Sequence, residues 1–122
     1  MKPINIKAVM KDKPKFVSPD GKASFWIGDA FNGGMIGVAK FSGQSPWERH
    51  PEADELIHNL EGEVEIILLK EKLPTKVTVS EGSVFIVPKG IWHRQSSEKG
   101  VIQFGATSGK TEHSMEEDPR RS

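Results

Sequence analysis

The most constraining feature of this chain is the run GSVFIVPKGIWH at residues 82–93. Its β-branched and aromatic residues favour a strand, and Pro88 and Gly90 favour a sharp corner directly after it. His93 follows the corner, where the next strand would begin, and an imidazole at that place is able to coordinate a metal ion. The run therefore predicts a strand, a fixed corner and a candidate metal ligand in one short segment.

Similar short runs recur along the chain between turn signals, and convincing helical periodicity is missing. Twelve glycines and eight prolines in 122 residues give the frequent turns of an all-β protein. We predict eight strands, which in this order suit a jelly-roll barrel, the double-stranded β-helix, with a turn at residues 98–100 before the last strand. The predicted strands cover residues 23–31, 35–42, 55–60, 63–69, 76–80, 83–87, 93–97 and 101–107.

The charge and composition of the chain exclude several classes of function. Lys and Arg number 17, as do Asp and Glu, so no basic excess points to nucleic acid and no charge block points to a membrane surface. The longest apolar stretch, residues 66–69, is far too short to span a bilayer. Cysteine is absent, which fits a cytoplasmic location and leaves imidazole and carboxylate as the available metal ligands.

A second segment, residues 48–63, carries the remaining candidate ligands. Glu48 and His50 point to the same side if this stretch is extended, because side chains alternate between the faces of a strand. Glu55 follows at the start of the next predicted strand. Together with His93 these residues offer two imidazoles and two carboxylates, a set that suits hard divalent ions such as Mn(II) or Fe(II).

These two segments resemble the two signature motifs of the cupin superfamily. The second motif, G-x5-P-x-G-x2-H, is matched at every fixed position, and Ser97 stands where an Asn often follows it. The first motif, H-x-H-x4-E-x6-G, is matched at His50, Glu55 and Gly62, while Glu48 replaces its first histidine. The chain is therefore similar to a small single-domain cupin.

The resemblance implies that Glu48, His50, Glu55 and His93 converge inside a barrel and bind a divalent metal ion, with Fe or Mn favoured and Ni or Zn possible. Glu48 would be either a fourth ligand or a catalytic general base. The resemblance also implies a homodimer. We expect an N-terminal arm at residues 1–15 that pairs as a strand with a second subunit, a barrel at residues 16–107, and a mobile charged tail at residues 108–122.

Strand parity selects three candidates for binding a substrate. Asn59 has the same parity as Glu55, Gln95 the same parity as His93, and Gln103 is a further polar residue of a predicted strand. His58 has the opposite parity to Glu55, which favours a packed or interface histidine. His113 lies in the predicted tail, and we expect no role for it.

The function that the sequence favours is a metal-dependent enzyme, of dioxygenase or isomerase type, acting on a small polar organic molecule. Two alternatives stay open. A non-catalytic cupin module that binds a metal or a small molecule would use the same fold. An isomerase without metal would use the histidines and glutamates directly as acid and base.

Overall fold

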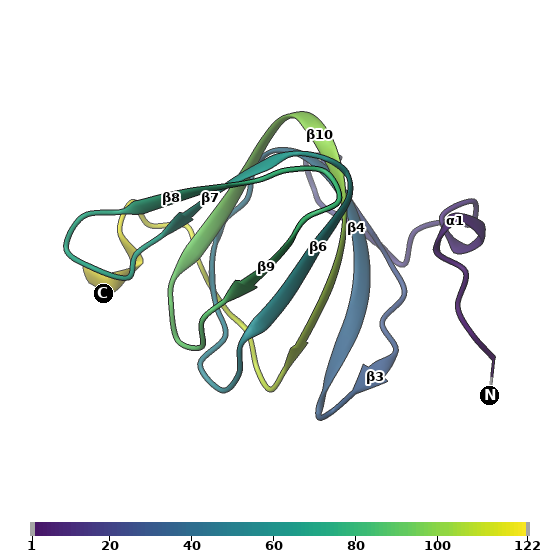
Figure 1. The fold of residues 1–122 in the computed structure, drawn as a ribbon, viewed down its shortest axis with the longest axis horizontal. Helices are drawn as coiled ribbons and strands as arrows, with labels where there is room; N and C mark the ends of the chain where they lie inside the picture. Colours follow the sequence, from purple (N-terminus) through teal and green to yellow (C-terminus); the bar gives the residue numbers. More distant parts are fainter. Residues whose placement is uncertain (1, 122) are drawn as a thin grey trace.

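Strands of the computed structural model, which describes residues 2–121, form one continuous antiparallel sheet that curls into a barrel (Figure 1). The predicted all-β jelly-roll fold is confirmed. A four-residue helix precedes the strands and a 3-10 turn follows them. In chain order the elements are α1 (Ile6–Val9), β1 (Phe16–Val17), β2 (Ala23–Trp26), β3 (Ala30–Phe31), β4 (Gly34–Gln44), β5 (Trp47–Arg49), β6 (Glu55–Gly62), β7 (Val64–Leu68), β8 (Thr75–Val79), β9 (Val84–Val87), β10 (His93–Ser108), β11 (Glu112–Ser114) and η1 (Pro119–Arg121).

The long strand β10 joins the two layers of the barrel. Residues 93–96 pair with β7, while residues 101–107 pair with β6 and also with β4 on the other edge. The predicted turn at residues 98–100 is wrong, because the chain bends here through a register shift and continues as one strand. Ser97 stabilises the bend: its hydroxyl donates to the carbonyl of Glu63 at 2.8 Å and accepts from the amide of Gly100 at 3.2 Å.

The other predicted strands agree with the structure to within a few residues, except at residues 23–31. There the chain forms two short strands, β2 and β3. Positive φ angles at Ile27 (66°) and Gly28 (159°) interrupt the extended backbone between them. Ile27 keeps its side chain buried despite this unfavourable backbone conformation for a β-branched residue.

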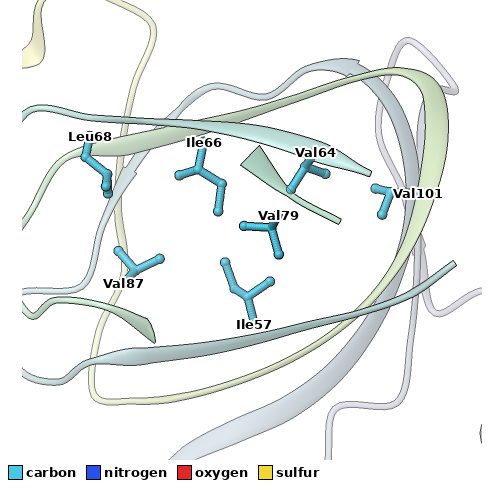
Figure 2. Close-up of a cluster of buried hydrophobic side chains, with 7 residues drawn as sticks. All are labelled: Ile57, Val64, Ile66, Leu68, Val79, Val87 and Val101. Atoms are coloured by element: carbon cyan, nitrogen blue, oxygen red, sulfur yellow. The ribbon is translucent and has the colours of Figure 1, made fainter. Parts of the chain in front are cut away.

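The barrel interior is filled by aliphatic side chains that point toward one another from both layers (Figure 2). Since side chains alternate along a strand, every second residue of β7 contributes to this cluster, and β6 contributes Ile57. β7 shows the alternation most clearly, with Val64, Ile66 and Leu68 buried and the residues between them partly exposed. The cluster consists of Ile57, Val64, Ile66, Leu68, Val79, Val87 and Val101.

A second, smaller cluster lies around Trp26, Ile27 and Val38. The N-terminal arm packs against it through three apolar residues of α1 and its C-cap, Ile6, Val9 and Met10. The helix begins at Asn5, whose side chain accepts a hydrogen bond from the amide of Ala8 at 2.9 Å. This part of the arm is therefore helical, and the predicted extended strand is wrong for residues 6–9.

The C-terminal segment folds back onto the barrel. β11 pairs with the outer edge of β5, and Pro119 in η1 is buried. Part of the segment predicted as a mobile charged tail at residues 108–122 is therefore a strand, because residues 112–114 use their backbone groups to extend a sheet edge. Among residues 2–121, no helix is long and apolar enough to span a membrane.

Candidate metal centre

Four side chains come together where β5, β6 and β10 meet. Glu48 is the middle residue of β5, and His50 follows directly after that strand. Glu55 begins β6 and His93 begins β10. The corner at residues 88–90 sets the start of β10, so that His93 lies directly opposite Glu48 in the antiparallel pairing. All four candidate ligands predicted from the sequence are brought to one place.

The ligand atoms of these four residues lie within 4.8 Å of one another. Glu55 Oε1 is 3.2 Å from Nε2 of His50 and 3.2 Å from Nε2 of His93. Glu48 Oε1 is 2.9 Å from Nε2 of His50 and 3.7 Å from Nε2 of His93. Two imidazole nitrogens and two carboxylate oxygens therefore face a common centre.

Each histidine holds its other ring nitrogen away from this centre. Nδ1 of His93 lies 3.1 Å from the carbonyl oxygen of Ile91, and since a carbonyl only accepts, Nδ1 carries the proton. Nδ1 of His50 lies 3.0 Å from the hydroxyl oxygen of Thr111. A metal-ligating histidine needs such a partner to fix its tautomer and its ring orientation.

Nε2 of His50 shows the strongest fit to a cation. The residue is only 4% exposed, and within residues 2–121 this nitrogen has no hydrogen bond of acceptable geometry. Two carboxylate oxygens lie nearby but off the axis of an N–H bond, and a buried polar atom without a partner is costly. A cation between the nitrogen and the carboxylates would satisfy all of these groups, so the donor set fits a divalent metal ion.

In the protein without metal, protons take the place of the cation. Burial lowers the pKa of both histidines, but the contacts with Glu48 and Glu55 outweigh it, raising the pKa of His50 to about 9 and that of His93 to about 10. Burial raises the pKa of Glu48, yet its contacts with His113, His50 and His93 hold that pKa well below its usual range. The pKa of Glu55 is also lowered, because His50 and His93 outweigh its burial.

Sequence reasoning missed two residues that reach the site from the C-terminal segment, Thr111 and His113. His113, for which the sequence predicts no role, contacts the site: its Nε2 lies 3.2 Å from Oε2 of Glu48. Nothing in the sequence pattern indicates that β11 pairs with β5, so neither contact was predictable. The only local signal is the parity of Thr111 and His113, which places both on one face of a strand.

The three predicted substrate-binding residues form a chain of amide hydrogen bonds on the inner side of the barrel. Gln95 and Gln103 pair reciprocally, with N···O distances of 3.0 and 2.8 Å. Gln103 also donates to Asn59 at 2.8 Å, and Asn59 donates to the carbonyl of Val79 at 2.9 Å. Asn59 is fully buried and Gln103 nearly so, while Gln95 is partly exposed. Of the three, Gln95 is the most exposed to solvent.

The fold and the site together define a β-barrel with a candidate centre of two histidines and two carboxylates. The family model for the cupin domain matches residues 36–100, more than half of the chain. The protein belongs to the cupin family, as its two sequence motifs suggest.

Two curated relatives and one solved structure illustrate this similarity. The uncharacterized protein YdbB of Bacillus subtilis (strain 168) is 39% identical over 75 residues, which are 62% of this chain and 63% of that protein. Germin-like protein 1-1 of Oryza sativa subsp. japonica is 46% identical over 57 residues, 45% of this chain and 26% of that protein. The chain thus spans less than two thirds of either relative.

The solved structure is an oxalate oxidase in complex with the substrate analogue glycolate. It is 16% identical, with a TM-score of 0.67, and the match covers 86% of this chain and 61% of that one. At this identity the match shows a shared fold.

Proposed function

We propose that this protein is a metal-dependent enzyme, of dioxygenase or oxidase type, that acts on a small polar organic molecule. The observation that carries the proposal is the convergence of four ligand atoms within 4.8 Å around a buried imidazole nitrogen that has no hydrogen bond within residues 2–121. Mn(II) or Fe(II) suits this donor set best, and Ni(II) or Zn(II) is the alternative. When bound, such an ion supplies Lewis acidity and, for iron, redox chemistry with dioxygen.

The different exposure of the four side chains supports different tasks for them. His93, His50 and Glu55 are 2%, 4% and 15% exposed, so they form the inner part of the site. Glu48 is 31% exposed and lies on the solvent side. A molecule that enters the site would meet Glu48 first, so this residue has the position of a general base that accepts a proton from it. A small polar molecule with an acidic proton is the substrate class that this arrangement suits.

Gln95 is the neighbour of the site that we propose for orienting the substrate. It lies two residues after His93 on the same strand and keeps part of its side chain exposed. Its amide is held in place by the reciprocal pair with Gln103, which limits the orientations it can adopt. Asn59 would then act indirectly, by fixing Gln103.

Metal analysis of protein purified without an affinity tag tests the metal part of the proposal. We expect near-stoichiometric Fe or Mn in the wild type and its loss in His93→Ala. His58→Ala is the control and should retain the metal, because His58, the pairing partner of Phe104, lies on the face of the sheet opposite to the metal centre. Glu48→Gln separates the two roles of this residue, since a ligand is needed for binding and a base only for turnover. No metal after reconstitution with Fe, Mn, Ni and Zn would overturn the proposal and leave a metal-free cupin.

Oxygen uptake tests the catalytic part. The metal-loaded protein would be screened with small hydroxy acids and dicarboxylic acids, and we expect consumption of oxygen that Glu48→Gln reduces by about 100-fold or more. Stoichiometric metal without turnover, for any compound of the screen, would favour the second candidate function.

That second candidate is a non-catalytic module that binds metal or a small molecule. One observation favours it: two cavities of the protein are lined by residues other than the four candidate ligands. One of about 580 Å³ lies between Trp47, Arg94 and the C-terminal segment, and one of about 380 Å³ lies beside Gly62 and Val101.

We also propose a homodimer that forms through the outer face of β6 and β9. On the edge strand β9, Val84 and Ile86 are 57% and 49% exposed, and they lie beside His58 and Leu56. Exposed neighbouring aliphatic residues of this kind are typical of an interface. Light scattering after gel filtration would show a dimer that Ile86→Lys converts to a monomer. A cytoplasmic location stays a prediction from the sequence.

A further inference from the structure

We propose that the C-terminal strand is a working part of the metal centre: Thr111 positions His50 and His113 positions Glu48, so the site holds metal tightly only while this strand is docked. The inference rests on the metal site proposed above and adds to it two positioning residues and a coupling to the chain terminus.

The pairing of three strands places these residues in a row. β5 is bonded on one edge to β10 and on the other edge to β11, and Glu48 is the pairing partner of His93 on one side and of His113 on the other. Residues directly opposite in neighbouring strands have side chains on the same face, about 5 Å apart. His93, Glu48 and His113 therefore follow one another across the sheet, and the last of them comes from the C-terminal segment.

The alternation of side chains along the C-terminal segment explains why it contacts the site twice. Thr111 and His113 point toward the ligands. Glu112, between them, points to the other face, where its carboxylate lies 2.6 Å from Nη2 of Arg49. The guanidinium of Arg49 in turn lies 4.7 Å from the ring centroid of Trp92. One face of the segment thus anchors it to the barrel, and the other face contacts two ligands.

The contact of Thr111 with His50 determines which nitrogen is available to the metal. When the hydroxyl oxygen of Thr111 accepts a hydrogen bond from Nδ1–H of His50 at 3.0 Å, the proton of the neutral ring is on Nδ1. Nε2 then has a free lone pair, which is directed at the carboxylates. In the same way, the backbone carbonyl oxygen of Ile91 accepts a hydrogen bond from Nδ1–H of His93. For His93 the partner is backbone of the barrel, whereas for His50 it is a side chain of the C-terminal segment. The orientation of His50 therefore depends on the docking of that segment.

The contact of His113 with Glu48 selects the oxygen that faces the metal. His113 lies 3.2 Å from Oε2, which leaves Oε1 directed at His50 and His93. Glu48 is the most exposed of the four ligands, so without His113 its carboxylate would be free to rotate toward water. Partners of this kind change metal affinity by roughly 10- to 100-fold.

Coupling between two binding events is reciprocal. If a docked C-terminal strand increases metal affinity, then bound metal increases the fraction of molecules with the strand docked. The exposed Lys110 lies directly before Thr111, so its peptide bond is a trypsin site that reports on undocking. Metal should therefore protect this bond from cleavage.

The experiment measures two quantities for each variant: the dissociation constant for Mn(II), by competition with a chelator, and the rate of trypsin cleavage after Lys110 with and without Mn(II). For Thr111→Val we expect about 10- to 100-fold weaker binding, with affinity restored in Thr111→Ser, which keeps the hydroxyl. For His113→Ala we expect weaker binding, partly restored in His113→Gln, which keeps an N–H donor. In the wild type, Mn(II) should slow cleavage.

Ser114→Ala is the matched control, because Ser114 lies in the same strand and its hydroxyl accepts a hydrogen bond from the amide of Glu116, away from the four ligands. We expect it to bind Mn(II) like the wild type. His113 is 61% exposed, so its substitution keeps the test valid even if Thr111→Val does not fold. Wild-type affinity in both Thr111→Val and His113→Ala would overturn this inference alone. Failure of the wild type to bind any metal would overturn the metal site itself, and this inference with it.

Discussion

The imidazole rings of His50 and His93 lie 5.4 Å apart between their centroids and are tilted by 41°. They lie 43 residues apart in the sequence (93 − 50), yet both Nε2 atoms are 3.2 Å from the same oxygen of Glu55. On the side away from Glu55, Nδ1 of each ring is hydrogen-bonded, in His50 to Thr111 and in His93 to Ile91. The geometry is thus prepared for a cation, and protons on the histidines replace that cation when it is absent.

Metal binding should release protons. Because the pKa is about 9 for His50 and about 10 for His93 without metal, both are protonated at pH 7 and must lose their protons to become ligands. We expect the dissociation constant for Mn(II) to fall by about 100-fold per pH unit near neutrality and to level off near pH 10. Calorimetry in two buffers of different ionisation enthalpy would count the protons, and a count near zero would contradict the ion pairs.

Without metal, the protein should lose stability as the pH rises. A histidine whose pKa is higher in the folded state than its unfolded value of about 6.5 stabilises the folded state. This stabilisation is complete below pH 6.5 and is lost as the pH rises through the folded-state pKa. For His50 and His93 the loss therefore falls between about pH 6.5 and pH 10. We expect Tm of the chelator-treated protein to fall by roughly 5–10 °C over this window.

The metal-loaded protein is the control for this pH dependence, since its histidines are neutral ligands throughout. Its Tm should stay nearly constant over the same window. An equal decline in both forms would show that other groups cause the loss.

Gly62 should not tolerate alanine. Its φ of +80° is a left-handed conformation, and an added Cβ would collide with the backbone carbonyl of Gly100 on β10. Gly82 has a nearly identical φ of +81° but open space around it. Gly82→Ala should therefore lower the free energy of unfolding by about 1 kcal/mol, and Gly62→Ala should lower it by about 2 kcal/mol more. Urea unfolding of both variants isolates the collision, and equal losses would show that β10 shifts to make room.

In the chain of amide side chains inside the barrel, we expect the buried residue Asn59 to contribute to the stability of the fold. Asn59→Leu leaves the carbonyl of Val79 without its donor and removes one acceptor from Gln103, so we expect a loss of roughly 2 kcal/mol. Gln95→Leu removes only the half-exposed end and should cost less. Equal stability of the wild type and Asn59→Leu would mean that this amide is retained for a ligand.

Much of the barrel was predictable from residue patterns, because turns and strand parity are local properties. The strand, corner and histidine of residues 82–93 appear as β9, the Pro88–Gly90 turn and His93. The two cupin motifs identify Glu48, His50, Glu55 and His93, although spacing alone does not show that β5 and β10 are neighbours.

The remaining features depend on contacts between distant segments. Whether residues 98–100 form a turn or a bend within one strand depends on Ser97 and its bond to Glu63, 34 residues away. Whether residues 112–114 form a tail or a strand depends on a free edge of β5, which becomes visible only once the barrel is folded. No local pattern contains that information.

The pairing of β11 with β5 also limits insertions and deletions in the segment that leads into β11. A strand repeats its facing every two residues, so deletion or insertion of one residue between Gly109 and Thr111 would turn Thr111 and His113 outward and Glu112 inward. A third carboxylate would then face two others, in place of a hydroxyl and an imidazole. Single-residue gaps here should therefore be rarer among functional variants than substitutions are.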